Sequence, residues 1–127
     1  EKRYTYGKPC PQCPAMGITW YQAQKYCQWA GKRLPTEAEW EAAARGNSAF
    51  IWPWGNKHRP GHANTFGNAD GFLFMAPVAS FSKGTSPFGV MDMAGNVWEW
   101  VIGESKDLNK GIFTISVAII KSGDILF

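Results

Sequence analysis

The chain has 127 residues, enough for one domain with a hydrophobic core and too few for two ordinary domains. Charged residues make up 18% and aromatic residues 15%, a composition that favours a folded protein over a disordered one. The net charge is +3, but lysine and arginine are scattered along the chain, so we expect no nucleic-acid partner. The longest apolar run, residues 112–120, is about half as long as a bilayer-spanning helix, so no membrane span is expected.

Residues 1–17 are rich in proline, lack any clean periodicity, and are predicted to form an extended N-terminal arm. Cys10 and Cys13 have the spacing of a redox motif, but no predicted helix follows to lower the pKa of a thiol. A local disulfide or loose metal chelation is therefore favoured over oxidoreductase chemistry. With Cys27 the chain has 3 cysteines, so at least one thiol stays unpaired within the chain.

Two short helices are predicted in tandem. Capping boxes begin at Thr19 and at Thr36, each is followed by apolar residues at helical spacing, and each helix ends at a glycine. These signals predict helices over about 20–30 and 37–45. We expect the two helices to meet at an angle through Trp20, Trp29 and Trp40.

Residues 47–88 show no lasting periodicity and are predicted to be a long loop. Ordering such a loop costs entropy, and a bound cation would offset that cost. Within 89–101, the spacing of Trp98 and Trp100 predicts a strand, expected to be central, with both indoles on one face. Alternating apolar residues in 113–127, interrupted by a turn, predict a C-terminal hairpin.

Five sequence blocks follow the pattern of one known family in order and in spacing. They are 18–30, 31–41 (GKRLPTEAEWE), 53–56 (PWGN), 63–65 (ANT) and 92–100 (DMAGNVWEW). On these blocks the chain resembles the formylglycine-generating enzyme, or sulfatase-modifying factor, family over about residues 18–101. Several independent blocks in sequence order are far more specific than any single motif.

The resemblance implies an α+β, C-type lectin-like fold with two short helices, small antiparallel sheets and long loops that are often stiffened by calcium. Residues 18–127 would then form a single domain after the arm 1–17. The last part, 102–127, diverges because it contains neither the Arg-Gly-Gly-Ser-Trp block nor the Gly-Phe-Arg ending of the family.

Two calcium sites also follow from the resemblance, and the loops contain the hard oxygen ligands that calcium prefers. The first site would use the side chains of Asn64 and Asp70 with main-chain oxygens near Thr65 and Phe72. The second would use the side chains of Asn96 and Glu99 with the carbonyl of Val97. On the residues alone, the asparagines could instead cap turns and Glu99 could face solvent.

Enzymes of the family oxidise a substrate cysteine to formylglycine, using oxygen and copper held by two cysteines near the C-terminal end. That pair is not found in this sequence, so no catalytic residue is assigned and copper is not expected. Cys10 and Cys13 precede the core of the family fold. Cys27 lies on the apolar face of the first predicted helix and is expected in the core.

Relatives that form sulfur–carbon bonds use a non-haem iron, but take its ligands from a separate helical domain. His58 and His62 are separated by Pro60 and Gly61 and cannot share one helical face, so we expect exposed loop histidines.

The sequence therefore predicts a non-catalytic, calcium-stiffened lectin-like module that binds a protein partner or a glycan, or docks into a larger complex. Calcium sites in loops fill where calcium is plentiful, which favours a periplasmic or secreted location. One alternative is part of a formylglycine-generating oxidase. A second is an accessory domain of a non-haem iron sulfoxide synthase.

Overall fold

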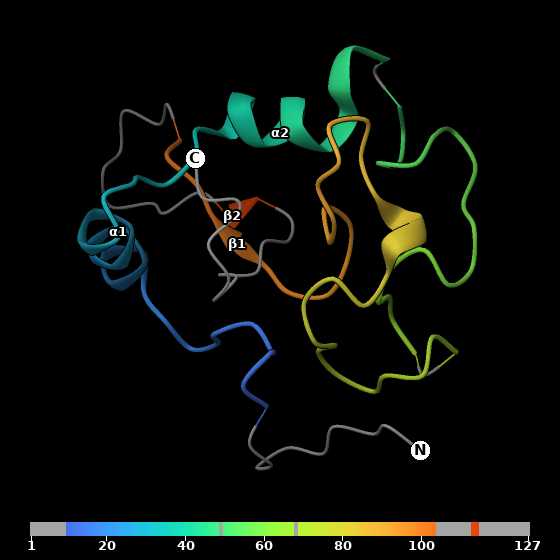
Figure 1. Ribbon diagram of the computed structural model, residues 1–127, viewed down its shortest axis with the longest axis horizontal. Coiled ribbons are helices and arrows are strands. Elements are labelled where there is room, and N and C mark those ends of the chain that lie inside the picture. The colour runs from blue at the N-terminus through green and yellow to red at the C-terminus, as the bar shows by residue number, and fades with distance from the viewer. Residues whose placement is uncertain (1–9, 49, 68, 104–112, 115–127) are drawn as a thin grey trace.

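The computed structural model describes residues 10–48, 50–67, 69–103 and 113–114. These residues contain two α-helices, two 3-10 turns and little strand. The elements are α1 (Trp20–Trp29), α2 (Glu37–Arg45), η1 (Gly46–Ser48), η2 (Ser82–Gly84), β1 (Glu99–Trp100) and β2 (Phe113–Thr114). Figure 1 shows α1 on the left, α2 across the top, and β1 with β2 near the centre. Both helices lie where the capping boxes predict them.

Helix α1 begins with a complete capping box. The Thr19 backbone amide donates to Gln22 Oε1 at 2.7 Å, and the Gln22 amide donates to Thr19 Oγ1 at 3.3 Å. The chain leaves the helix through Gly31, whose φ of 72° is a left-handed conformation that suits glycine. The buried face of α1 contains Ala23 and Cys27, which confirms the predicted core position of Cys27.

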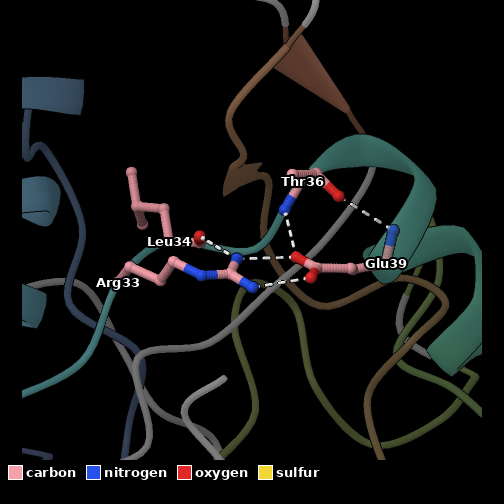
Figure 2. A network of polar contacts seen from close by, with 4 residues as sticks. All are labelled: Arg33, Leu34, Thr36 and Glu39. Carbon is pink, nitrogen blue, oxygen red and sulfur yellow. Dashed lines mark hydrogen bonds and ion pairs between the residues drawn. The ribbon is translucent and has the colours of Figure 1, made fainter.

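Helix α2 is fixed at its start by a polar network (Figure 2). The Glu39 carboxylate accepts the Thr36 backbone amide at 2.8 Å, and Thr36 Oγ1 accepts the Glu39 amide at 3.2 Å. Arg33 binds both oxygens of Glu39, at 2.7 Å and 2.6 Å, and also donates to the Leu34 carbonyl. These bonds connect the segment before α2 to the first turn of the helix and orient the two relative to each other.

Strand β1 pairs with β2 in antiparallel register, Glu99 with Thr114 and Trp100 with Phe113. Beyond β1, Ile102 forms a parallel bridge to Thr36, with its amide donating to the Pro35 carbonyl at 2.8 Å. The end of β1 is thereby joined to the start of α2. The predicted hairpin after Thr114 lies outside the described residues. Between η1 and β1 the described chain is irregular apart from η2 and one isolated bridge, as predicted for 47–88.

Two hydrophobic clusters form the described core, and the segment that contains β1 runs between them. One cluster contains Trp40, Ala43, Ala44, Met93 and Val101, and the other contains Ala23, Cys27 and Leu34, with Ile18, Trp20, Trp100 and Ile102 packed against it. Alternation along a strand points successive side chains to opposite sides, so Val101 faces the first cluster while its two neighbours face the second.

The predicted contact between the helices through three tryptophans is therefore wrong. Trp20 and Trp40 belong to different clusters, because the segment after Glu99 separates them, and Trp29 is 81% exposed. The prediction for the strand is also only partly right. Trp98 and Trp100 are two residues apart, but only Trp100 packs inward, donating from Nε1 to the Ile18 carbonyl at 3.0 Å, and Trp98 is exposed. In the described part of the chain, no helix is long and apolar enough to cross a bilayer.

Candidate cation-binding site

Two buried carboxylates flank the bend at residues 94–97, which leads into β1. Glu99, in β1, is 4% exposed, and Asp92, before the turn, is 9% exposed. Trp40 Nε1 donates to Glu99 Oε2 at 2.8 Å, and the Ala79 backbone amide donates to Asp92 Oδ2 at 2.6 Å. Neither carboxylate forms a salt bridge with another described residue.

Burial dominates the electrostatics of both groups. It raises the pKa of the Glu99 carboxyl well above its ordinary value, with a smaller upward contribution from the charge of Asp92 and an opposing one from the Trp40 hydrogen bond. Burial also raises the pKa of Asp92, against the lowering effect of the Ala79 amide. Two acidic groups that influence each other in a low-dielectric region are costly to ionise together unless a positive charge joins them.

A hard divalent cation is a candidate partner for these two carboxylates. Calcium prefers carboxylate and carbonyl oxygens, and its charge would compensate both Asp92 and Glu99. The main-chain carbonyl of Val97, between these residues in sequence, is a further candidate ligand. Across 10–48, 50–67 and 69–103, no three His, Cys, Asp or Glu side chains gather in a metal-binding group, so the other ligands would be neutral oxygens.

Asp70 closes a second loop. Its Oδ2 accepts the Thr65 amide at 2.8 Å and its Oδ1 accepts the Phe72 amide at 3.0 Å. The structure thus brings Asp70, Thr65 and Phe72 together, three of the residues predicted for the first calcium site. Each carboxylate oxygen keeps lone-pair capacity beyond these single bonds.

The two predicted sites meet at a pair of asparagines. Asn64 Nδ2 donates to the Phe74 carbonyl at 2.7 Å and to Asn96 Oδ1 at 3.0 Å. Asn96 Oδ1 also accepts the Ala76 amide at 2.8 Å, and Asn96 Nδ2 donates to the Ala76 carbonyl at 3.2 Å. The side chain of Asn96 therefore cross-links two loops. None of these three bonds is with Glu99, its predicted partner in the second calcium site.

The sequence prediction missed Asp92. It lies at the start of a block that matched the family, but an aspartate before a turn is normally assumed to face solvent. A signal was present, because Val90, Met91 and Met93 around it are apolar and favour burial of this stretch. The φ of 60° at Asp92, uncommon for any residue with a side chain, is not readable from sequence.

Comparison with known proteins decides the family. Residues 3–126 match the family described as the sulfatase-modifying factor enzyme 1-like domain. The chain belongs to this family. The match includes most of the N-terminal arm and of the C-terminal part, beyond the residues 18–101 on which the resemblance rested.

Relatives of this sulfatase-modifying factor domain include proteins with contrasting names. The present chain is 41% identical over 100 residues to the inactive C-alpha-formylglycine-generating enzyme 2 of Bos taurus, and the match covers 72% of this chain and 33% of that protein. It is also 41% identical over 102 residues to the formylglycine-generating enzyme of Mycobacterium tuberculosis, with coverages of 72% and 33%. The chain thus spans about a third of the length of these relatives.

A solved structure supports the fold. PvdO from Pseudomonas aeruginosa is similar with a TM-score of 0.63 and 39% identity, over 75% of this chain and 40% of that chain. The predicted two helices and long loops agree with the described residues. The prediction of several small antiparallel sheets is not confirmed, because the described residues contain one two-stranded pair, β1–β2.

The cysteines of this sulfatase-modifying factor domain are not available as a thiol pair. Cys10 and Cys13 form a disulfide, the first of the two outcomes that the sequence left open. Cys27 is free but buried, and burial raises the pKa of its thiol. A buried, protonated thiol is a poor ligand for soft metals and a poor nucleophile.

The two histidines lie on an aromatic stack. The Trp52 and Trp54 rings are stacked with centroids 5.4 Å apart, the ring of His58 approaches Trp52 at 5.4 Å, and that of His62 approaches Trp54 at 5.3 Å. His58 is exposed, as predicted, whereas His62 is half-buried. The two imidazoles therefore contact different indoles, His58 edge-on to Trp52 and His62 tilted against Trp54.

Proposed function

We propose that this sulfatase-modifying factor domain is a non-catalytic, calcium-stiffened lectin-like module. The observation that carries the proposal is the pair of buried carboxylates, Asp92 and Glu99, held without a cationic side chain among the described residues. In a small protein with long irregular loops, an ion that joins these acidic groups would also supply order that secondary structure does not.

The state of the cysteines supports a non-catalytic role. Copper(I) favours soft thiolate ligands, and two close, accessible thiolates are required to hold it. Cys10 and Cys13 are bonded to each other, and Cys27 is buried. The described residues thus offer oxygen ligands for a hard cation and no thiol pair for a soft one.

Exposed apolar side chains on the candidate cation loops support partner binding. Phe66 follows Thr65, Leu73 and Phe74 follow Phe72, and Trp98 follows Val97, and all four of these large side chains are exposed. Large aromatic side chains are typical anchors of protein interfaces. We therefore propose a protein partner, in a larger extracytoplasmic complex, with the calcium-ordered loops presenting the contact residues. A disulfide and calcium sites in loops both favour an oxidising, calcium-rich compartment.

Thermal unfolding with excess calcium and with a chelator tests the cation. Calcium at about a hundred times its Kd would stabilise the folded state by roughly 2.7 kcal/mol, and a domain of this size would melt several degrees higher. The same measurement on Glu99→Gln, which keeps the acceptor for Trp40 but removes one charge, should show a much smaller calcium response. Equal melting temperatures of the unchanged protein in calcium and in chelator would refute the proposal.

A second function is supported by the similarity to formylglycine-generating enzymes, of which this chain covers about a third. In that case the domain would be part of an oxidase that converts a peptide cysteine to formylglycine. The two functions are separated by incubating the full natural protein with copper, oxygen and a cysteine-containing peptide and then measuring the mass of the peptide by mass spectrometry. Formation of an aldehyde product would replace the non-catalytic proposal.

A further inference from the structure

We propose that the Cys10–Cys13 disulfide positions Asp92 and so makes the affinity of the cation site depend on the redox state of these cysteines. This inference rests on the proposed calcium site and adds a form of regulation to it. The disulfide lies in the N-terminal arm, far in sequence from Asp92. Two hydrogen bonds connect them, one between backbone groups and one from a backbone amide to the Asp92 carboxylate.

The first bond joins the disulfide loop to the segment before η2. Cys13 donates its amide to the Cys10 carbonyl at 3.0 Å, so the disulfide and this bond together close a tight turn. Within that turn, the Gln12 carbonyl accepts the Val78 amide at 2.9 Å. A closed four-residue loop holds its carbonyls in fixed directions, and the position of Val78 therefore depends on the turn.

The second bond starts from the next residue. Ala79 donates its amide to Asp92 Oδ2 at 2.6 Å. Ala79 and Asp92 both have a φ of 60°, a conformation that residues with a side chain rarely adopt. Such conformations persist only where neighbouring contacts impose them. The hydrogen bond from Val78 to Gln12 is a contact of that kind, because it fixes the Pro77–Val78 peptide, one residue before the amide that Ala79 donates.

Opening the disulfide would release this chain of contacts. A dithiol reductant attacks one sulfur, forms a mixed disulfide, and then closes its own disulfide, leaving Cys10 and Cys13 as thiols after transfer of two electrons and two protons. Both cysteines are half-buried and so keep some access to solvent. The Gln12 carbonyl would then lose its fixed direction, Ala79 would relax from its strained conformation, and Asp92 would lose the amide that orients it.

Calcium binding to the full chain, measured by calorimetry in the oxidised and reduced states, tests the inference. Loss of one oriented carboxylate is expected to weaken calcium affinity roughly tenfold. Amide exchange of Val78 and Ala79 should become faster on reduction, whereas amides of α1 should not change. The Cys10→Ser, Cys13→Ser double variant should behave like the reduced protein without any reductant present.

Three controls make the result specific. Gln12→Ala keeps the backbone acceptor and should behave like the unchanged protein. Cys27→Ala should retain the full redox response. In Asp92→Asn, calcium binds more weakly from the start, and reduction should have little additional effect, which a general loss of stability would not produce.

Two results separate the inference from the proposed function. Equal calcium affinity in the oxidised and reduced states would overturn the inference and leave the calcium site intact. If neither state binds calcium, the proposed function is refuted, and unchanged exchange at Val78 and Ala79 would then also exclude the positioning role.

Discussion

Asn64 and Asn96 are joined by two hydrogen bonds, although they lie 32 residues apart in sequence. One runs from Asn64 Nδ2 to Asn96 Oδ1 at 3.0 Å, and the other from the Asn96 amide to the Asn64 carbonyl at 2.8 Å. They place the loop of Asp70 next to the turn that leads to Glu99. In a region with little secondary structure, bonds of this kind supply order that helices and strands supply elsewhere.

Asn96→Ala tests the strength of this junction. The change removes three side-chain hydrogen bonds and places alanine at a φ of 67°, so we expect a loss of about 2–4 kcal/mol in the free energy of unfolding, measured with urea. Asn96→Asp keeps the acceptor for Asn64 and Ala76 and should lose less. If both variants unfold at the same urea concentration as the unchanged protein, the asparagines are not a structural junction.

Gly95→Ala tests how closely the two loops approach. An added Cβ would lie 2.1 Å from the Asn64 carbonyl oxygen, in addition to the strain of alanine at a φ of 80°. Gly89→Ala is a matched control, because its φ is 82° and an added Cβ meets nothing within 4 Å. Both changes should cost about 1–2 kcal/mol from strain, and Gly95→Ala should cost clearly more because backbone must move. Equal losses in the two variants would show that the loops are free to separate.

The helices could be predicted from sequence because their signals are local. The capping boxes that begin at Thr19 and Thr36 each span only four residues, and each correctly predicts the first residue of its helix. The packing of the helices was not predictable in this way. Whether Trp20 and Trp40 touch depends on the strand that passes between them, and that placement depends on contacts across more than half of the chain.

The candidate site shows the same limit. A family pattern can select Asn64, Asp70, Asn96 and Glu99 as polar residues in the right order, but it does not state which side chains are used up in bonds between loops. The amide of Asn96 is used in this way. The burial of Asp92 depends on a left-handed backbone conformation and on a hydrogen bond from the Ala79 amide, 13 residues earlier in the chain.

The ion pair at the start of α2 predicts a pH effect at the acidic extreme. Hydrogen bonds from Arg33 lower the pKa of Glu39 to about 2. A carboxyl with a lowered pKa stabilises the folded state above its unfolded pKa, and that contribution is lost as the pH falls through the folded value. Glu39→Gln should therefore melt below the unchanged protein at pH 6, and the difference in melting temperature should shrink towards pH 2. A difference that stays constant over this range would mean that Arg33 does not hold Glu39 in solution.

The buried Glu99 carboxyl should give the stability of the folded state the opposite dependence on pH. Burial raises its pKa, so without calcium the folded state binds the proton more strongly than the unfolded state does. Stability is then greatest below the unfolded pKa and decreases as the pH rises above about 4.5. In chelator, the unchanged protein should melt at a lower temperature at pH 8 than at pH 5.

Glu99→Gln separates the charge of this group from its hydrogen bond. The glutamine oxygen can still accept the Trp40 indole N–H, but the buried charge is gone, so in chelator the variant should be at least as stable as the unchanged protein at pH 8. Calcium requires the ionised carboxylate, and its stabilising effect on the unchanged protein should therefore be larger at pH 8 than at pH 5 and nearly absent in the variant. Melting curves of both proteins at the two pH values, with calcium and with chelator, measure all of these differences. A variant that is less stable at pH 8 in chelator and still responds fully to calcium would show that Glu99 is a structural acceptor for Trp40 and not a cation ligand.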